Sequence, residues 1–171
     1  MDFVKTVVLL IATAIFLSAC SQPLPEETHV VLEFKVAQNI NPDDRQRPSP
    51  LVISVFELKT PDTFQQSDFF SLYEHPAEQL SADLVSKRKL RELVPGIDRT
   101  DNFNLNSDTR YVGILAEFAQ YQQAKARLIV PVKQKIANRV VVELSGTELK
   151  WVHEAEKEKT QEGAELQPVR L

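Results

Sequence analysis

Cysteine, glycine and histidine are scarce in this chain of 171 residues, which has one cysteine, four glycines and three histidines. The single cysteine, Cys20, permits neither an internal disulfide nor a site in which several thiolates bind a metal. His29, His75 and His153 are too scattered to form a paired metal motif such as H-x-x-x-H. Four glycines supply neither a glycine-rich phosphate loop nor a G-x-S-x-G nucleophile turn. The sequence therefore predicts no metal site and no enzymatic activity.

An excess of positive charge is also missing. The chain has 20 Lys and Arg residues against 24 Asp and Glu residues, which gives a formal net charge of −4. Nucleic-acid-binding domains normally carry a strongly basic face, so we expect no nucleic-acid partner. The acidic residues at 43–44 and 98–101 are typical of solvated turns, with ion binding as the alternative. The basic run at 87–91 is interpreted as a solvated edge, with phospholipid contact as the alternative.

No apolar run is long enough to span a membrane as a helix. Lys5 precedes a short hydrophobic segment, Val7 to Leu17, which falls well below the roughly 20 residues that such a helix needs. A positive start, a short apolar run and small residues after it are typical of a secretory signal. The segment ends in Leu17-Ser18-Ala19-Cys20, which resembles the lipobox of bacterial lipoproteins. A signal peptide followed by a chance cysteine is the alternative.

The lipobox resemblance implies that residues 1–19 are a signal peptide and that Cys20 becomes the first residue of the mature chain. It also implies covalent lipid on Cys20, a diacylglycerol on the thiol and an acyl chain on the new amine, with no other cofactor. Several acyl chains give stable membrane anchoring, whereas one gives only reversible binding. Residues 20–29 contain two prolines and are interpreted as an extended, lipidated tether. Ser21, in place of an aspartate retention signal, favours sorting to the outer membrane, with the domain in the periplasm.

Most of the mature chain has the alternation of apolar and polar residues that is typical of strands. Ser145-Gly146-Thr147 predicts a hairpin turn between the last two runs, because Gly146 tolerates positive φ. Pro131 confines its own run to a sheet edge. Short strands separated by turns predict a mainly β fold, a two-sheet β-sandwich over residues 30–153. The predicted strands are Val30–Val36, Leu51–Leu58, Tyr111–Phe118, Leu128–Val132, Val140–Leu144 and Leu149–Trp151, with weaker candidates at 102–106 and around Pro95-Gly96.

One section, residues 61–89, is predicted to be a small helical insertion in the sandwich. Phe69, Leu72 and Tyr73 have the i, i+3, i+4 spacing of one helix face, and Pro76 is well placed to begin a second helix. Its aromatic cluster is interpreted as part of the core, since aromatics at helical spacing usually face inward. This cluster consists of Phe64, Phe69, Phe70 and Tyr73. Residues 154–171 are charged and are predicted to be a flexible tail.

The connection between the first two strong strands, residues 39–50, is longer than the two to five residues of a usual hairpin. Its prolines limit the unfolded ensemble and therefore reduce the entropy cost of ordering it. Such a loop favours either partner binding or a passage from one sheet to the other, and the residues alone leave both open. The candidate binding residues are Asn39, Asn41, Pro42, Asp43, Asp44, Arg45, Gln46, Arg47, Pro48 and Ser49.

Several blocks in order resemble the TssJ family, the outer-membrane lipoproteins of the bacterial type VI secretion system. Each block is weak alone, but the ordered set is specific and covers residues 30–151. The sequence departs from the family pattern at Gln46, where we expect glycine, and before Arg127, where we expect tryptophan. The matching blocks are Asn41-Pro42-Asp43, residues 47–50, 55–59 and 68–73, Asp83-Leu84, Pro95-Gly96, and residues 110–116.

The resemblance implies a transthyretin-like sandwich with a small helical addition. It also implies a lipid anchor in the outer membrane and binding to the periplasmic C-terminal region of the inner-membrane protein TssM. Together with other type VI membrane-complex subunits, these two proteins would form a complex across the envelope. In this family the loop between the first two strands makes the contact, which corresponds to residues 39–50. A carbohydrate- or cell-wall-binding lipoprotein is the alternative, and a hydrolase would need a constellation that sequence spacing does not reveal.

Overall fold

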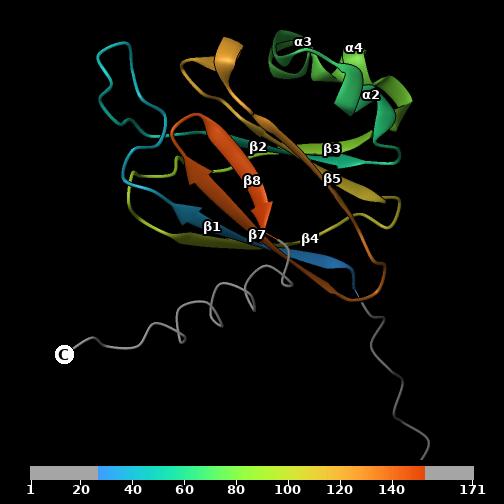
Figure 1. Ribbon diagram of the computed structural model, residues 1–171. Helices are drawn as coiled ribbons and strands as arrows, with labels where there is room; N and C mark the ends of the chain where they lie inside the picture. Colours follow the sequence, from blue (N-terminus) through green and yellow to red (C-terminus); the bar gives the residue numbers. More distant parts are fainter. Residues whose placement is uncertain (1–26, 153–171) are drawn as a thin grey trace, which may run out of the picture.

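The computed structural model describes residues 27–152, which form a sandwich of two four-stranded sheets (Figure 1). The two-sheet β-sandwich expected from the alternating pattern is thereby confirmed. Residues 1–26 and 153–171 lie outside the described part, and with them the predicted signal peptide, Cys20, most of the tether and the tail. No helix among the described residues has the length and apolarity needed to cross a bilayer.

The first sheet has the strand order β4-β1-β7-β8. Strand β1 (His29–Val36) pairs antiparallel with β4 (Arg99–Asn104) and parallel with β7 (Ala137–Ser145). Alternate residues of β1, from Val30 to Val36, are buried against the other sheet, as its period-two pattern predicts. Strand β8 (Glu148–Val152) returns beside β7 through the predicted turn, in which Gly146 has a φ of 55°.

The second sheet has the strand order β3-β2-β5-β6. All six residues of β2 (Ile53–Leu58) are buried, because it lies between β3 (Leu84–Lys89) and β5 (Tyr111–Ala116) and both of its faces are covered. Strand β6 (Arg127–Pro131) is an edge strand that ends at its proline, as predicted. The cores of both sheets meet in one cluster of buried side chains.

Three short helices cover the outer face of the second sheet (Figure 1). They are α2 (Asp62–Gln66), α3 (Phe69–Glu74) and α4 (Pro76–Leu80), followed by a single 3₁₀ turn, η1 (Ser81–Asp83). Phe64 of α2 is fully buried, with its ring 5.2 Å from the ring of Phe56 on β2. Gly113 of β5 makes room for this ring, since a Cβ there would lie 2.9 Å from Phe64.

Two expectations for the helical insertion are wrong. Residues 84–89 form β3 and not a helix, because their backbone pairs with the otherwise open edge of β2, from Leu58 with Leu84 to Ser54 with Lys89. Sheet pairing here outweighs the local helical pattern. The aromatic cluster is also not all core: Phe70 is 47% exposed and Tyr73 is 41% exposed, while Phe64 is buried.

The sandwich has two ends with different contents. The end at which β1 begins, here called the tether end, carries the connections 105–110 and 132–136. The opposite end, here called the loop end, carries the connections 37–52, 90–98 and 117–126 and the turn at Gly146. Strand β1 runs between them with eight residues, or about 26 Å at 3.3 Å per residue. In Figure 1 the two ends lie to the lower right and the upper left.

Candidate partner-binding loop

The predicted binding loop passes from the first sheet to the second at the loop end, since β1 and β2 belong to different sheets. Its path is therefore a crossover, and the comparison with hairpin lengths does not apply to it. Its tip nevertheless projects from the sandwich as a compact turn (Figure 1). The exposed residues of this turn are Asp44, Arg45, Gln46, Arg47 and Pro48.

Asn41 fastens the base of the loop. It is only 5% exposed, and its backbone N–H donates to the Gly146 carbonyl at 2.8 Å. Its side-chain Nδ2 donates to the carbonyl of Pro50 at 2.7 Å, and its Oδ1 accepts from the backbone N–H of Ala119 at 2.8 Å. Ser49 donates its hydroxyl to the Asn41 carbonyl at 2.6 Å. One asparagine thus joins both arms of the loop to two other connections at the loop end.

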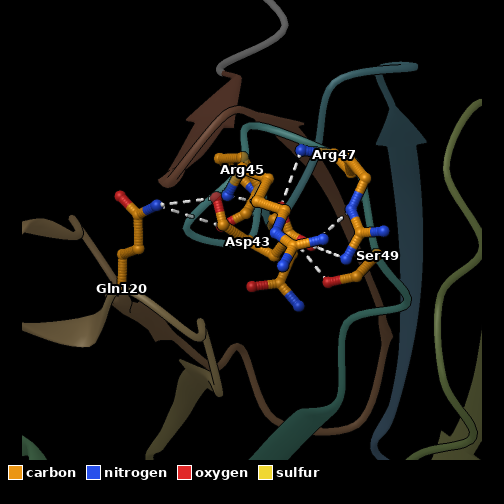
Figure 2. A network of polar contacts seen from close by, with 7 residues as sticks. Asp43, Arg45, Arg47, Ser49 and Gln120 are labelled. Atoms are coloured by element: carbon orange, nitrogen blue, oxygen red, sulfur yellow. Dashed lines mark hydrogen bonds and ion pairs between the residues drawn. The ribbon is translucent and has the colours of Figure 1, made fainter.

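Asp43 closes the tip into a small ring (Figure 2). Its Oδ1 accepts the backbone N–H groups of Arg45 and Arg47 at 2.8 and 2.9 Å, and its Oδ2 pairs with the Arg47 guanidinium at 2.6 Å. The backbone N–H of Asp43 also donates to the Arg47 carbonyl at 2.9 Å. These hydrogen bonds from Arg47 hold the pKa of Asp43 below its ordinary value of 3.8, so the carboxylate stays charged at neutral pH.

Gln46 has a left-handed backbone, with φ at 59°. Glycine adopts this conformation without a Cβ clash, which gives a physical reason for the glycine expected at this position. The N–H of Gln46 donates to the Asp43 carbonyl at 2.9 Å, so the turn is closed in spite of the larger side chain. The departure from the pattern therefore leaves the turn itself in place.

Gln120 supports the loop from outside, and sequence reasoning missed it. Its Nε2 donates to the carbonyls of Pro42 and Asp43, both at 3.2 Å (Figure 2). The next residue, Tyr121, begins the 3₁₀ turn η2 (Tyr121–Gln123), and its ring lies 5.0 Å from Phe69 and 4.8 Å from Phe70 of α3. The helical layer therefore contacts the residue next to the loop's support. No sequence signal marks Gln120, because its partners lie 77 and 78 positions away.

The remaining predicted residues have smaller parts. Asn39 is exposed and accepts from the Ser145 hydroxyl and the Gly146 N–H, both at 3.3 Å. Pro42 is half-buried, and Pro48 extends from the tip. The structure therefore brings all the candidate loop residues into one projection, in which Asn41 and Asp43 hold the shape and the tip faces solvent.

The turn at 94–97 lies beside the base of the loop. Gly96 donates its N–H to the Ala37 carbonyl at 3.2 Å and has a φ of 75°. Val94 and Ile97 are 48% and 60% exposed, which adds two aliphatic side chains to the loop end. Two acidic residues nearby form salt bridges: Asp98 with Lys35 at 2.7 Å, and Asp101 with Arg99 at 2.7 Å. Within residues 27–152 no group of three or more His, Cys, Asp and Glu side chains is arranged to hold a metal ion.

Comparison with known proteins gives one family. The model of the family described as type VI secretion lipoprotein (VasD, EvfM, TssJ) matches residues 28–147. The comparison with curated proteins gives no match.

Three solved structures resemble the fold. The T6SS lipoprotein TssJ1 from Pseudomonas aeruginosa is 27% identical, with a TM-score of 0.69 over 74% of this chain and 95% of that one. Serratia marcescens Lip, a membrane-bound component of the type VI secretion system, is 21% identical, with a TM-score of 0.67 over 74% and 98%. A chain in the structure of the T6SS protein TssM C-terminal domain from EAEC is 18% identical, with a TM-score of 0.62 over 74% and 98%.

Proposed function

Because this chain belongs to the type VI secretion lipoprotein family, we propose that it is anchored in the outer membrane through lipid on Cys20 and binds the inner-membrane protein TssM. The contact is made by the loop at 39–50 with the periplasmic C-terminal region of TssM. Other subunits of the membrane complex join the two proteins in a trans-envelope assembly. The chain contributes attachment and binding, without catalysis.

The placement of the loop is the observation that carries this proposal. The chain enters the sandwich at the tether end, and the loop projects from the opposite end, one length of β1 away (Figure 1). A lipid at Cys20 would therefore leave the loop facing away from the membrane, toward the periplasm. A solved structure of the TssM C-terminal domain contains a chain of the same fold, which supports TssM as the partner.

The internal bonds of the loop favour binding by reducing its cost. Ordering a flexible loop at an interface opposes association, whereas a loop that is already closed loses less entropy. Asn41 and Asp43 close this one in the free protein, so the tip is presented in a fixed shape. Confinement of both proteins to the envelope raises their effective concentration, and a modest contact is then sufficient.

A binding measurement between the mature domain and the periplasmic region of TssM tests the proposal. The informative variant is Asp44→Ala/Arg45→Glu/Pro48→Ala, which changes exposed side chains of the tip and keeps Asn41 and Asp43. We expect it to fold normally by circular dichroism and to lose TssM binding. Lys135→Gln at the tether end is the matched control and should bind like the wild type. Equal binding by the loop variant would remove the loop from the interface.

A carbohydrate-binding role is a second candidate, because the structure exposes two aromatic rings of the helical layer. Phe70 and Tyr73 are 47% and 41% exposed, and aromatic faces can stack on sugars. Cosedimentation of the mature domain with purified peptidoglycan tests this role. Loss of cosedimentation in Phe70→Ala/Tyr73→Ala would support it, and absence of cosedimentation by the wild type would reject it.

A further inference from the structure

An aliphatic side chain flanked by lysines projects from the tether end. Ile136, in the connection between β6 and β7, is 47% exposed. Lys133 and Lys135 of the same connection are exposed, as is Arg110 from the neighbouring connection. These four residues, Arg110, Lys133, Lys135 and Ile136, are here called the tether-end surface. They take no part in the loop or in the helical layer.

The turn that carries Ile136 is held rigidly. Thr28 accepts the N–H of Lys135 on its hydroxyl oxygen at 2.8 Å. Asn138 accepts the N–H of Lys133 at 2.8 Å, and its Nδ2 donates to the carbonyls of Lys133 and Ile136 at 2.9 and 3.2 Å. Since these bonds fix the backbone on both sides, Ile136 is presented to solvent by the fold and not by a loose loop.

The tether-end surface lies where the chain enters the sandwich. The first residue of β1, His29, donates its N–H to the Ile136 carbonyl at 3.4 Å, and Ala137 pairs with His29 at the start of β7. Cys20 precedes Glu27 by seven residues. A fully extended segment of that length reaches at most about 25 Å. A lipid on Cys20 therefore keeps this end of the molecule close to the bilayer.

The charges at this end favour an anionic surface. Three exposed side chains there are positively charged, those of Arg110, Lys133 and Lys135, and two are negatively charged, those of Asp108 and Glu27. The Glu27 carboxylate already accepts a hydrogen bond from the Asn104 amide. An apolar side chain beside lysines suits the boundary between lipid headgroups and acyl chains, because lysine stems cover apolar surface while the ammonium groups stay at the phosphates.

We propose that the tether-end surface rests on the membrane, with Ile136 at the headgroup level and the three cationic side chains on the phosphates of anionic phospholipids. The surface then fixes the tilt of the domain, so that the loop end points away from the bilayer. The inference rests on the proposed function only for the membrane attachment at Cys20. It is independent of the partner that the loop binds.

The single cysteine of the chain, and a single tryptophan moved to the tether end, provide the test. Coupling the mature polypeptide through the Cys20 thiol to a maleimide lipid in vesicles supplies the attachment chemically, without bacterial lipidation and without TssM. Trp151 pairs with Val142, six residues or about 20 Å along β7 from Ile136, and is too far from the tether-end surface to report on it. The reporter is therefore a tryptophan placed at exposed Ala137, beside Ile136, in a Trp151→Phe background, and this protein serves as the wild type of the test. Vesicles of phosphatidylcholine alone, or with phosphatidylglycerol, carry a brominated lipid that quenches tryptophan at short range.

We expect stronger quenching on vesicles with phosphatidylglycerol, weakening at high salt as charge screening increases. Ile136→Ser/Lys133→Gln/Lys135→Gln should lose the quenching while keeping the circular dichroism spectrum and thermal midpoint of a folded domain. The matched control is Ile97→Ser, which removes an exposed isoleucine at the loop end and should leave quenching unchanged. Quenching that is equal in the wild type and the triple variant, or absent from both lipid compositions, would overturn the proposal. The membrane test contains no TssM, so its result does not depend on whether the loop variant loses TssM binding.

Discussion

Asn41 fastens the loop to two other connections at the loop end. It is buried, and its side chain and backbone form hydrogen bonds with Pro50, Ala119, Gly146 and Ser49. Its φ of 47° lies in the left-handed region, which asparagine tolerates better than most residues. Conformation and hydrogen bonding therefore favour the same residue type at this position.

Asn41→Ala should lower the free energy of unfolding by about 2 kcal/mol, because it leaves the Ala119 N–H and the Pro50 carbonyl without their partner at a part-buried site. Urea unfolding followed by circular dichroism measures this loss. Asn39→Ala is the control, since Asn39 is exposed and its bonds are long, and it should change stability by less than about 0.5 kcal/mol. Similar losses in the two variants would contradict the role given to Asn41.

Glu57 is a buried carboxylate at the tether end of β2, only 2% exposed. Its Oε2 accepts from the Thr109 hydroxyl at 2.6 Å and from the backbone and side chain of Asn106 at 2.8 and 2.9 Å, and its Oε1 accepts from Ser86 at 2.7 Å. Burial raises the pKa of Glu57, but the hydrogen bonds from Thr109, Asn106 and Ser86 together outweigh it and hold the pKa below its ordinary value of 4.5.

A depressed carboxyl pKa stabilises the fold above the unfolded pKa, and this contribution is lost as pH falls through the folded pKa. We therefore expect Glu57→Gln to lower the free energy of unfolding by about 3 kcal/mol at neutral pH. The NH₂ group of the new amide would lie against hydrogen-bond donors where a carboxylate oxygen now accepts. The difference from the wild type should begin to shrink below pH 4.5, where the unfolded chain takes up the proton, and should continue to shrink as pH falls through the lower folded pKa of Glu57. Urea titrations at several pH values measure both effects, with exposed Glu92→Gln as control. A difference that does not change with pH would contradict the assignment.

At the scale of elements, the helical layer depends on one small residue in the sheet beneath it. Gly113→Ala would place a methyl group 2.9 Å from the Phe64 ring and 3.1 Å from Leu58. Since Phe64 is the buried residue of α2, this overpacking should displace the helix and cost about 1 to 3 kcal/mol. Hydrogen exchange should then rise in α2 and less in β1, which lies in the other sheet. Ala116→Gly in the same strand offers a comparison that removes volume instead of adding it. Unchanged exchange in α2 would contradict the packing argument.

The strands that could be predicted from sequence are those with apolar alternation, such as β1, or with a continuous β-branched run, such as β2. Strand β3 could not, because only its first half is partly buried and the lysines and arginine of its second half give no periodic signal. The parallel pairing of β1 with β7 joins residues more than 100 positions apart and likewise leaves no local trace.

The loop itself could be located from its prolines and from the family resemblance, but its internal structure could not. The bonds from Asp43 to Arg47 are local and fit ordinary turn chemistry. The bonds of Asn41 to Ala119 and of Gln120 to Pro42 depend on two connections meeting at one end of the sandwich. Tertiary placement of this kind is set by the whole fold and not by the segment.

At the scale of the whole molecule, the proposed function places anchoring and partner binding at opposite ends of the sandwich. Cys20→Ser removes the thiol that lipid requires, so we expect the protein to leave the outer-membrane fraction and type VI secretion to be lost. Membrane fractionation and a secretion assay in the native bacterium measure both. A variant with Ser21 changed to Ala keeps the cysteine and should behave as the wild type. Normal fractionation and secretion by Cys20→Ser would refute the anchor.

The position of β1 between the two ends has a mechanical consequence. Any tension between a bilayer attachment and a partner held by the loop passes along this strand, which is bonded to β4 on one side and β7 on the other. Such a pull acts on the two ends of β1, so the covalent backbone carries it along the strand axis. Any lengthwise slip of β1 would have to break the hydrogen bonds of both ladders together. Strands peeled from an edge break their bonds one at a time. The sandwich therefore resists stretching along the one axis on which a machine spanning the envelope would strain it.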